Sequence, residues 1–186
     1  MEKMIRELIE RVIELARSYA ILLELGSPEN RQKYQNAFTD HEDFFTSTAH
    51  AYFQSIAVML YQLFDNGKGT KSIPNLFIAM EPANIDLVKK LRKDVDPHRQ
   101  ILKKVFDIRC NVYAHRNASL SPEEVFARAK LSVNALGALV SLTEDLIAEI
   151  AEVAGVGVGL EIINDFERRA DYAREDLQLI LGALSK

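Results

Sequence analysis

Glycine and proline are scarce in this chain, with 8 and 5 copies among 186 residues. No stretch alternates Val, Ile, Thr or aromatic residues with polar ones, which is the pattern of a half-buried β-strand. Long stretches instead place apolar residues three and four apart, as on one face of an α-helix. Because 48% of the residues are apolar, enough for one core at this length, the sequence predicts an all-α protein.

Cysteine and long apolar runs are also lacking. The single cysteine, Cys110, excludes an intramolecular disulfide and a zinc site built from several cysteines. We interpret it as a small buried hydrophobe rather than a nucleophile. No apolar run reaches the roughly 18 residues of a membrane span, and the N-terminal segment is charged. We therefore expect a soluble, cytoplasmic protein with no membrane contact.

Residue types that can bind a metal ion are adjacent at one place in the sequence, residues 40–43, which are Asp, His, Glu and Asp. Consecutive residues point to different faces of a helix, and no His-Glu-x-x-His pairing occurs in the chain. We expect neither a metal site nor a cofactor.

The apolar spacing predicts a helical bundle of four to five main helices plus short connecting helices. Main helices are expected over about 2–25, 40–65, 96–115 and 121–153, and short ones after 72 and over about 84–93. Asp96, followed by Pro97, is the expected N-cap of the third main helix, and Ser121 that of the fourth. Residues 1–154 form the predicted bundle, and the glycine-rich segment 155–159 is the predicted hinge after it.

The C-terminal segment 160–186 is predicted to be an amphipathic helix. Its apolar residues form a narrow seam: Ile163, Phe166, Ala170, Ala173, Leu177, Ile180 and Leu184. Such a seam needs a helical partner, which is either the bundle of the same chain or a second copy. Of the two, we favour a homodimer.

Groups able to act on a phosphodiester are concentrated in residues 108–117. Arg109, Asn111, Tyr113, His115 and Arg116 lie near the predicted end of one helix. Asn111 and His115 are four apart and share a helix face, and the two arginines share a neighbouring face. Guanidinium groups bind phosphate, and imidazole transfers protons near neutral pH. The alternative is that Arg and His at a helix C-terminus only interact favourably with the helix dipole.

A basic segment surrounds this motif. Residues 89–116 hold nine Lys or Arg against three Asp, a net charge of +6 in a chain of net charge −4. Arg99, Lys103 and Lys104 are its members just before the motif. Such a segment attracts a polyanion locally. Alternatively it is a solvated surface in which Lys103 and Lys104 pair with Asp107.

Residues 109–115, with five residues between Arg and His, resemble the motif of the HEPN superfamily (higher eukaryotes and prokaryotes nucleotide-binding). The segment Asn-Val-Tyr-Ala-His-Arg at 111–116 resembles the branch named after the AbiU abortive-infection proteins, as do the upstream segments 55–65 and 72–76. The likeness covers about residues 1–150. It implies a HEPN-like helical bundle and a role in phage defence or as a toxin.

The resemblance also implies a reaction, metal-independent RNA cleavage at a groove between two protomers. In catalytic relatives the RNA 2′-hydroxyl attacks the adjacent phosphate, leaving a cyclic phosphate and a 5′-hydroxyl. By position, His115 would move the proton, Arg109 would stabilise the phosphorane, and Asn111 would orient His115 or the phosphate. The expected partners are RNA, a second copy of the chain and a cognate antitoxin. The expected RNA-contacting residues are Arg116, Tyr113, Lys103, Lys104 and Arg99.

One position departs from the pattern of catalytic relatives. The residue after the motif arginine is commonly polar in them, whereas here it is Cys110 and the asparagine follows one place later. The alternative function is therefore a non-catalytic module that binds RNA, a nucleotide or a partner protein. On that interpretation Arg109 and His115 stabilise a helix end or a dimer interface.

Overall fold

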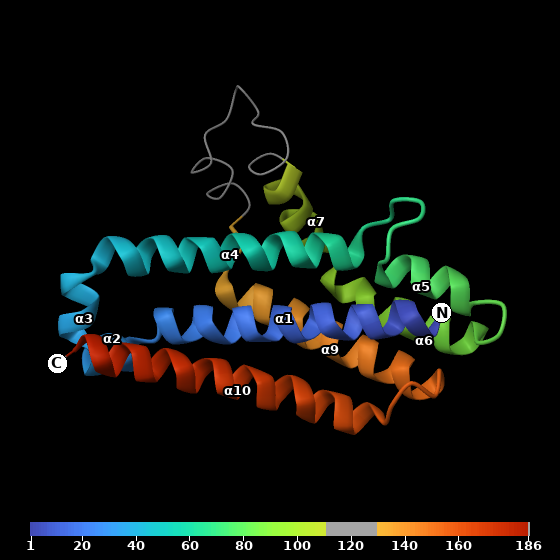
Figure 1. The fold of residues 1–186 in the computed structure, drawn as a ribbon. Coiled ribbons are helices and arrows are strands. Elements are labelled where there is room, and N and C mark those ends of the chain that lie inside the picture. Colours follow the sequence, from blue (N-terminus) through green and yellow to red (C-terminus); the bar gives the residue numbers. More distant parts are fainter. Residues whose placement is uncertain (111–129, 186) are drawn as a thin grey trace.

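A computed structural model describes residues 1–110 and 130–185, and within these ranges the chain is helical with no β-strand (Figure 1). The predicted all-α fold class is confirmed. The long helices are α1 (Glu2–Gly26), α4 (Glu42–Phe64), α9 (Val133–Val153) and α10 (Gly159–Leu184). The shorter elements are α2 (Pro28–Lys33), α3 (Gln35–Asp40), α5 (Ile73–Met80), α6 (Ile85–Val95), the 3₁₀ helix η1 (Asp96–His98) and α7 (Arg99–Ile108).

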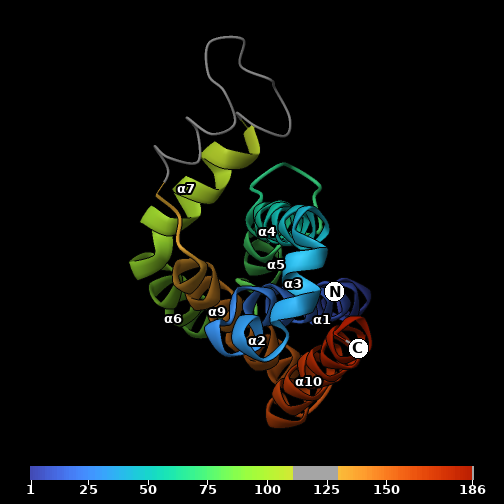
Figure 2. The same cartoon turned by 90° about the vertical axis from the view of Figure 1, so that its left-hand side faces the viewer.

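Helix α1 is the centre of the bundle, lying between α4, α9 and α10 (Figure 2). Ile5, Leu8, Val12 and Leu15 recur at helical spacing and are fully buried. Each buried side chain of this size stabilises the fold by about 1.5–3 kcal/mol before entropy is subtracted. The helix ends at Gly26, where Ser27 adopts an extended conformation and accepts a hydrogen bond from the Asn30 amide, so that α2 begins.

Helix α10 packs within its own chain, against α1 and α9. Phe166, Ala170, Ala173 and Leu181 are its buried apolar side chains. The predicted seam is wrong at its end, because Ile180 is 53% exposed and Leu184 is 40% exposed. A straight helix turns every 3.6 residues, so the buried row moves to Leu181 instead of keeping the heptad spacing.

The connection from α9 to α10 turns sharply. Gly155 has a φ of +67°, a backbone conformation that residues with a Cβ rarely adopt. Gly159 begins α10 at close approach to α9, since a Cβ there would lie 2.5 Å from a carboxylate oxygen of Glu152 and 3.3 Å from the carbonyl oxygen of Ala148. Glycine at 159 therefore allows the two helices to come together at this corner.

One predicted helix start is wrong, and another predicted helix is broken at Lys130. Asp96 does not cap an α-helix; it opens η1, and its carboxylate binds Arg99 at 2.8 Å, so α7 begins at Arg99. In the described part of the predicted helix over 121–153, Lys130 has a φ of +46° and α9 begins at Val133. The predicted N-cap Ser121 lies outside the described residues. Ser132 caps α9 by accepting a hydrogen bond from the Ala135 amide at 3.1 Å.

The first turn of α4 carries two phenylalanines in different environments. Phe44 is 60% exposed, and its ring meets that of buried Phe45 edge to face at 5.2 Å. No helix in the described part of the chain is both long and apolar enough to traverse a bilayer.

Candidate functional site

The described residues include the first half of the predicted site. Arg109 directly follows α7, and Arg99, Lys103 and Lys104 lie on that helix. The remaining predicted site residues lie outside the described residues: Asn111, Tyr113, His115 and Arg116.

The guanidinium of Arg109 lies over the ring of Tyr61 on α4, 4.3 Å from its centroid. The same ring meets Phe106 of α7 edge to face, with centroids 4.9 Å apart. A cation over an aromatic face gains about 0.5–2 kcal/mol. Tyr61 therefore positions the motif arginine against α4. Sequence reasoning did not assign Tyr61 to the site, although it lies in segment 55–65, which resembles the family.

Helix α7 is strongly amphipathic, and this fixes where its cations point. Leu102, Val105 and Ile108 are buried against the bundle, while Lys103 lies on the exposed face. Because side chains three and four apart share a helix face, burial of the apolar stripe leaves the lysine at the surface beside the motif. Lys104 is partly buried, and its ammonium donates to the Lys130 carbonyl at 3.5 Å.

Two cations of the basic segment, Lys90 and Arg92, are paired with carboxylates at the surface. Both carboxylate oxygens of Glu149 on α9 lie 2.6 Å from the ammonium of Lys90, and this hydrogen bond raises the pKa of Lys90. Arg92 makes a two-pronged contact with Glu81 at 3.1 and 3.2 Å. The charges of Lys90 and Arg92 are therefore partly neutralised by carboxylates of the same chain.

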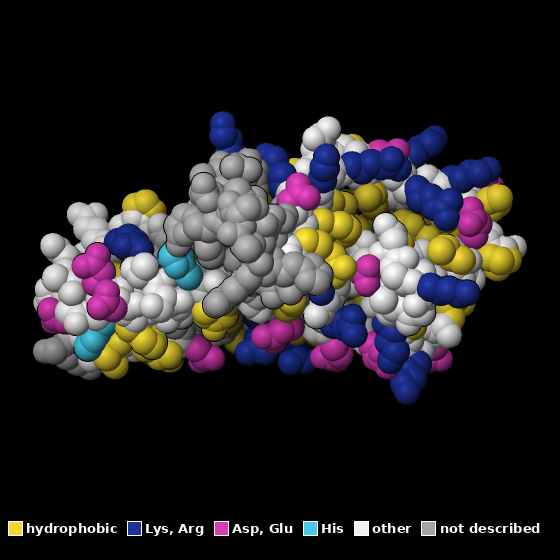
Figure 3. Space-filling view, turned by 90° about the horizontal axis from the view of Figure 1, so that it is seen from above, with side chains coloured by type: hydrophobic (Ala, Val, Ile, Leu, Met, Phe, Trp, Pro, Cys, Tyr) yellow, Lys and Arg dark blue, Asp and Glu magenta, His cyan; other side chains and the backbone are white. Residues whose placement is uncertain are grey.

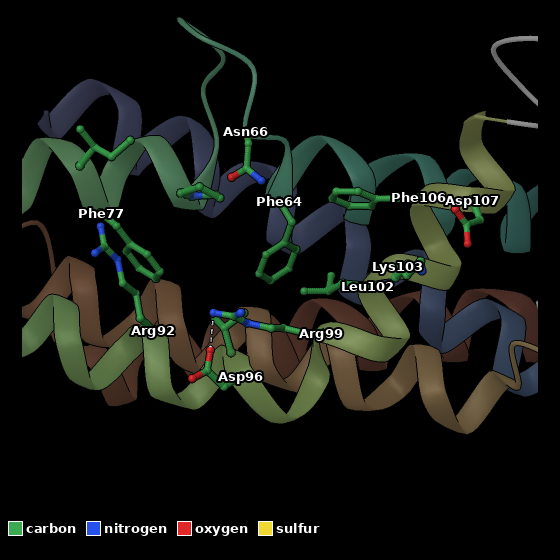
Figure 4. A pocket seen from close by; sticks show the side chains of 13 residues that line it. Phe64, Asn66, Phe77, Arg92, Asp96, Arg99, Leu102, Lys103, Phe106 and Asp107 are labelled. Atoms are coloured by element: carbon green, nitrogen blue, oxygen red, sulfur yellow. Dashed lines mark ion pairs between the residues drawn. The ribbon is translucent and has the colours of Figure 1, made fainter.

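An open groove of about 740 Å³ lies where α4, α5, α6 and α7 meet (Figure 4). Phe64 and Phe77 point into it from α4 and α5, and Arg99 and Lys103 lie along α7. Figure 3 shows this face, with hydrophobic side chains gathered on it and Lys and Arg side chains along one border. The lining residues are Phe64, Asn66, Pro74, Phe77, Ile78, Arg92, Val95, Asp96, Arg99, Leu102, Lys103, Phe106 and Asp107.

Cys110 was predicted to be buried, but it is only partly buried. It follows the end of α7 in a single π-helical turn with Arg109, so it sits at the margin of the core instead of inside it. Elsewhere, the described residues contain no group of three His, Cys, Asp or Glu side chains placed to hold a metal ion.

The fold defines this chain as an all-α helical-bundle protein. The model of one family, HEPN_AbiU2, described as AbiU2, matches residues 2–173. The chain therefore belongs to the HEPN AbiU2 family, a HEPN-type abortive-infection family. The matched range includes the whole motif from Arg109 to Arg116. No curated protein and no solved structure matches the chain.

Proposed function

We propose that this protein is a metal-independent endoribonuclease acting in abortive infection, with Arg109 and His115 as its catalytic pair. The observation that carries the proposal is the family match over residues 2–173, which spans the motif. The placement of Arg109 supports it, because Tyr61 positions the guanidinium directly after α7, the helix that carries Arg99, Lys103 and Lys104. A homodimer and a cognate antitoxin are the proposed partners.

In the proposed reaction the RNA 2′-hydroxyl attacks the adjacent phosphorus. A bond forms between the 2′-oxygen and phosphorus, the bond to the 5′-oxygen breaks, and a cyclic phosphate and a 5′-hydroxyl result. His115 takes up the proton lost by the 2′-hydroxyl, the departing 5′-oxygen gains one proton, and the proton balance of the cleavage is zero. Arg109 stabilises the charge that grows on the phosphorane oxygens. Asn111 orients His115 or the phosphate. No step requires a metal.

The test is cleavage of total RNA and tRNA in excess EDTA. We expect the native chain to cleave, and Arg109→Ala and His115→Ala to lose about 100-fold or more, as removal of a general acid–base or an electrostatic stabiliser does. Arg168→Ala, which removes an exposed arginine of α10, is the matched control and should retain activity. Equal activity in all four proteins would contradict the assigned roles.

The second candidate is a non-catalytic RNA-binding or protein-interaction module. Two observations favour it: Cys110 stands where catalytic relatives are commonly polar, and Arg109 stacks on Tyr61 within the same chain. On this alternative, Arg109→Ala lowers the free energy of unfolding by about 0.5–2 kcal/mol, and RNA is bound but never cut. The cleavage assay separates the two candidates, because the loss of stability in Arg109→Ala follows from the Tyr61 contact under both.

A further inference from the structure

The groove between α4, α5, α6 and α7 does not include Arg109, yet one of its lining residues connects it to that arginine. Phe106 forms its wall on α7, and the ring of Phe106 meets Tyr61, on which Arg109 lies. Lys103 is six residues before Arg109, a rise of roughly 9 Å along a helix. The groove thus ends one side chain away from the motif arginine.

The floor of the groove is apolar and includes flat rings. Phe64 and Phe77 are largely buried, with 4% and 5% of their surface exposed, so they are fixed in the core. Ile78 also lines the groove and is 61% exposed, so its side chain is open to contact with a ligand. A planar apolar group would cover this surface.

The rim carries charge of both signs. Arg92, Arg99 and Lys103 contribute positive charge, while Asp96 and Asp107 contribute negative charge. Arg92 is held by Glu81, and Arg99 by Asp96 at 2.8 Å. Lys103 projects from the exposed face of α7 at the end of the groove nearer Arg109. The lysine is therefore the rim cation best placed for a ligand that also reaches the motif.

We propose that this groove binds an unpaired nucleotide of the RNA strand that flanks the cleaved phosphate. Its base lies on the apolar floor at Ile78, and its phosphate interacts with Lys103. The volume of about 740 Å³ lies in the range of small-ligand pockets, and an apolar surface beside an exposed cation suits a base and its phosphate. Continuity with Arg109 favours an RNA strand over an acidic peptide. The inference rests on the proposed function for the identity of the strand.

The experiment measures binding of a fluorescent RNA whose 2′-hydroxyls are all methylated, so that it cannot be cleaved. Lys103→Glu and Ile78→Ser are the groove variants, and both replace exposed side chains. Lys89→Glu and Ile85→Ser are the matched controls, since these exposed residues of α6 are outside the groove. We expect each groove variant to weaken binding about fivefold or more and the controls to bind like the native chain. Circular dichroism confirms that each variant is folded.

A second arm tests which part of the strand is bound. Removing the base of one flanking nucleotide should weaken binding to the native chain and leave binding to Ile78→Ser unchanged, because that variant has already lost the contact. Equal loss in both proteins, or the same affinity for groove variants and controls, would overturn the inference. The inference would also be overturned if AMP or a polyglutamate peptide displaced the RNA while the groove variants still bound RNA normally.

The two proposals fail differently. If the native chain cleaves RNA and the groove variants bind and cleave like the controls, the groove inference is wrong and the nuclease stands. If no RNA is cleaved but groove variants lose binding of the methylated strand, the nuclease is wrong and the groove is an RNA site of a binding module.

Discussion

Glu144 of α9 faces a cleft of about 310 Å³ between α1, α9 and α10. Burial raises the pKa of its carboxyl from 4.5 to about 7, and the nearby charges of Asp145 and Glu167 act in the same direction. Tyr19 and Arg174 also line the cleft. The arrangement favours a neutral carboxyl, so we expect Glu144 to weaken the fold whenever it must ionise.

The direction of the pH effect on stability follows from proton binding by Glu144 in the folded and unfolded states. The folded state holds the proton up to about pH 7, whereas the unfolded chain releases it near 4.5. The stabilisation by the protonated carboxyl is thus fully present below pH 4.5 and is lost as the pH rises through 7. At about 1.4 kcal/mol for each pH unit, the loss is at most about 3 kcal/mol. Since the carboxyl is partly exposed, solvent screening lowers this expectation to about 1–2 kcal/mol.

The assay is urea unfolding of native chain and Glu144→Gln between pH 5 and 8. We expect the variant to gain stability relative to the native chain as the pH rises, reaching about 1–2 kcal/mol above pH 7. Glu175→Gln, on the exposed face of α10, is the control and should show no such trend. A difference between Glu144→Gln and native chain that does not change with pH would refute the reasoning.

Three substitutions test the packing and the site. Gly137→Ala should destabilise the fold by about 1–2 kcal/mol in urea unfolding, because the new Cβ would lie 2.2 Å from the Tyr19 hydroxyl, an overpacking that exceeds the gain in helix propensity. Ser132→Ala removes the cap of α9 and should cost about 0.5–2 kcal/mol. Tyr61→Leu should slow RNA cleavage about 3- to 30-fold by releasing Arg109, whereas Tyr61→Phe keeps the ring and the rate.

Each of these has an outcome that would contradict it. An unchanged or higher stability of Gly137→Ala would mean that the Tyr19 ring moves without cost. An unchanged stability of Ser132→Ala would mean that the cap hydrogen bond contributes nothing. Equal cleavage by Tyr61→Leu and Tyr61→Phe would show that the ring does not position the arginine.

The helices with long uninterrupted apolar stripes could be predicted from sequence. The stripe of α1 and the turn at Gly26 place that helix within one residue of its predicted end, 25. The second long helix, predicted over 40–65, is α4 at Glu42–Phe64. In both cases burial of one face against the bundle agrees with the local pattern, so local and tertiary preferences coincide.

The failures occur where local signals compete. Asp96 is a residue type that commonly caps α-helices, yet its carboxylate binds Arg99 in a 3₁₀ turn. The apolar periodicity predicted a helix that includes Lys130. Lys130 instead has a positive φ, and the helix begins after it, capped by Ser132. Such choices depend on side-chain pairings that spacing alone does not determine.

The candidate site, like the fold, could be predicted only in part from the sequence. The motif containing Arg109 is contiguous and was found from residue spacing and family resemblance. The contact with Tyr61 and the groove beyond it combine side chains from four successive α-helices, α4 to α7. No periodic pattern indicates which helices will adjoin, so this part of the site required the structure.

The most direct test of the central claim is cleavage of one RNA oligonucleotide in excess EDTA, compared with the same strand carrying a 2′-deoxynucleotide at the cut position. The account predicts that the all-RNA strand is cut to a cyclic phosphate and a 5′-hydroxyl, and that the deoxy position resists. Cleavage at the deoxy position would contradict attack by the 2′-hydroxyl, and an uncut RNA strand would contradict the nuclease itself.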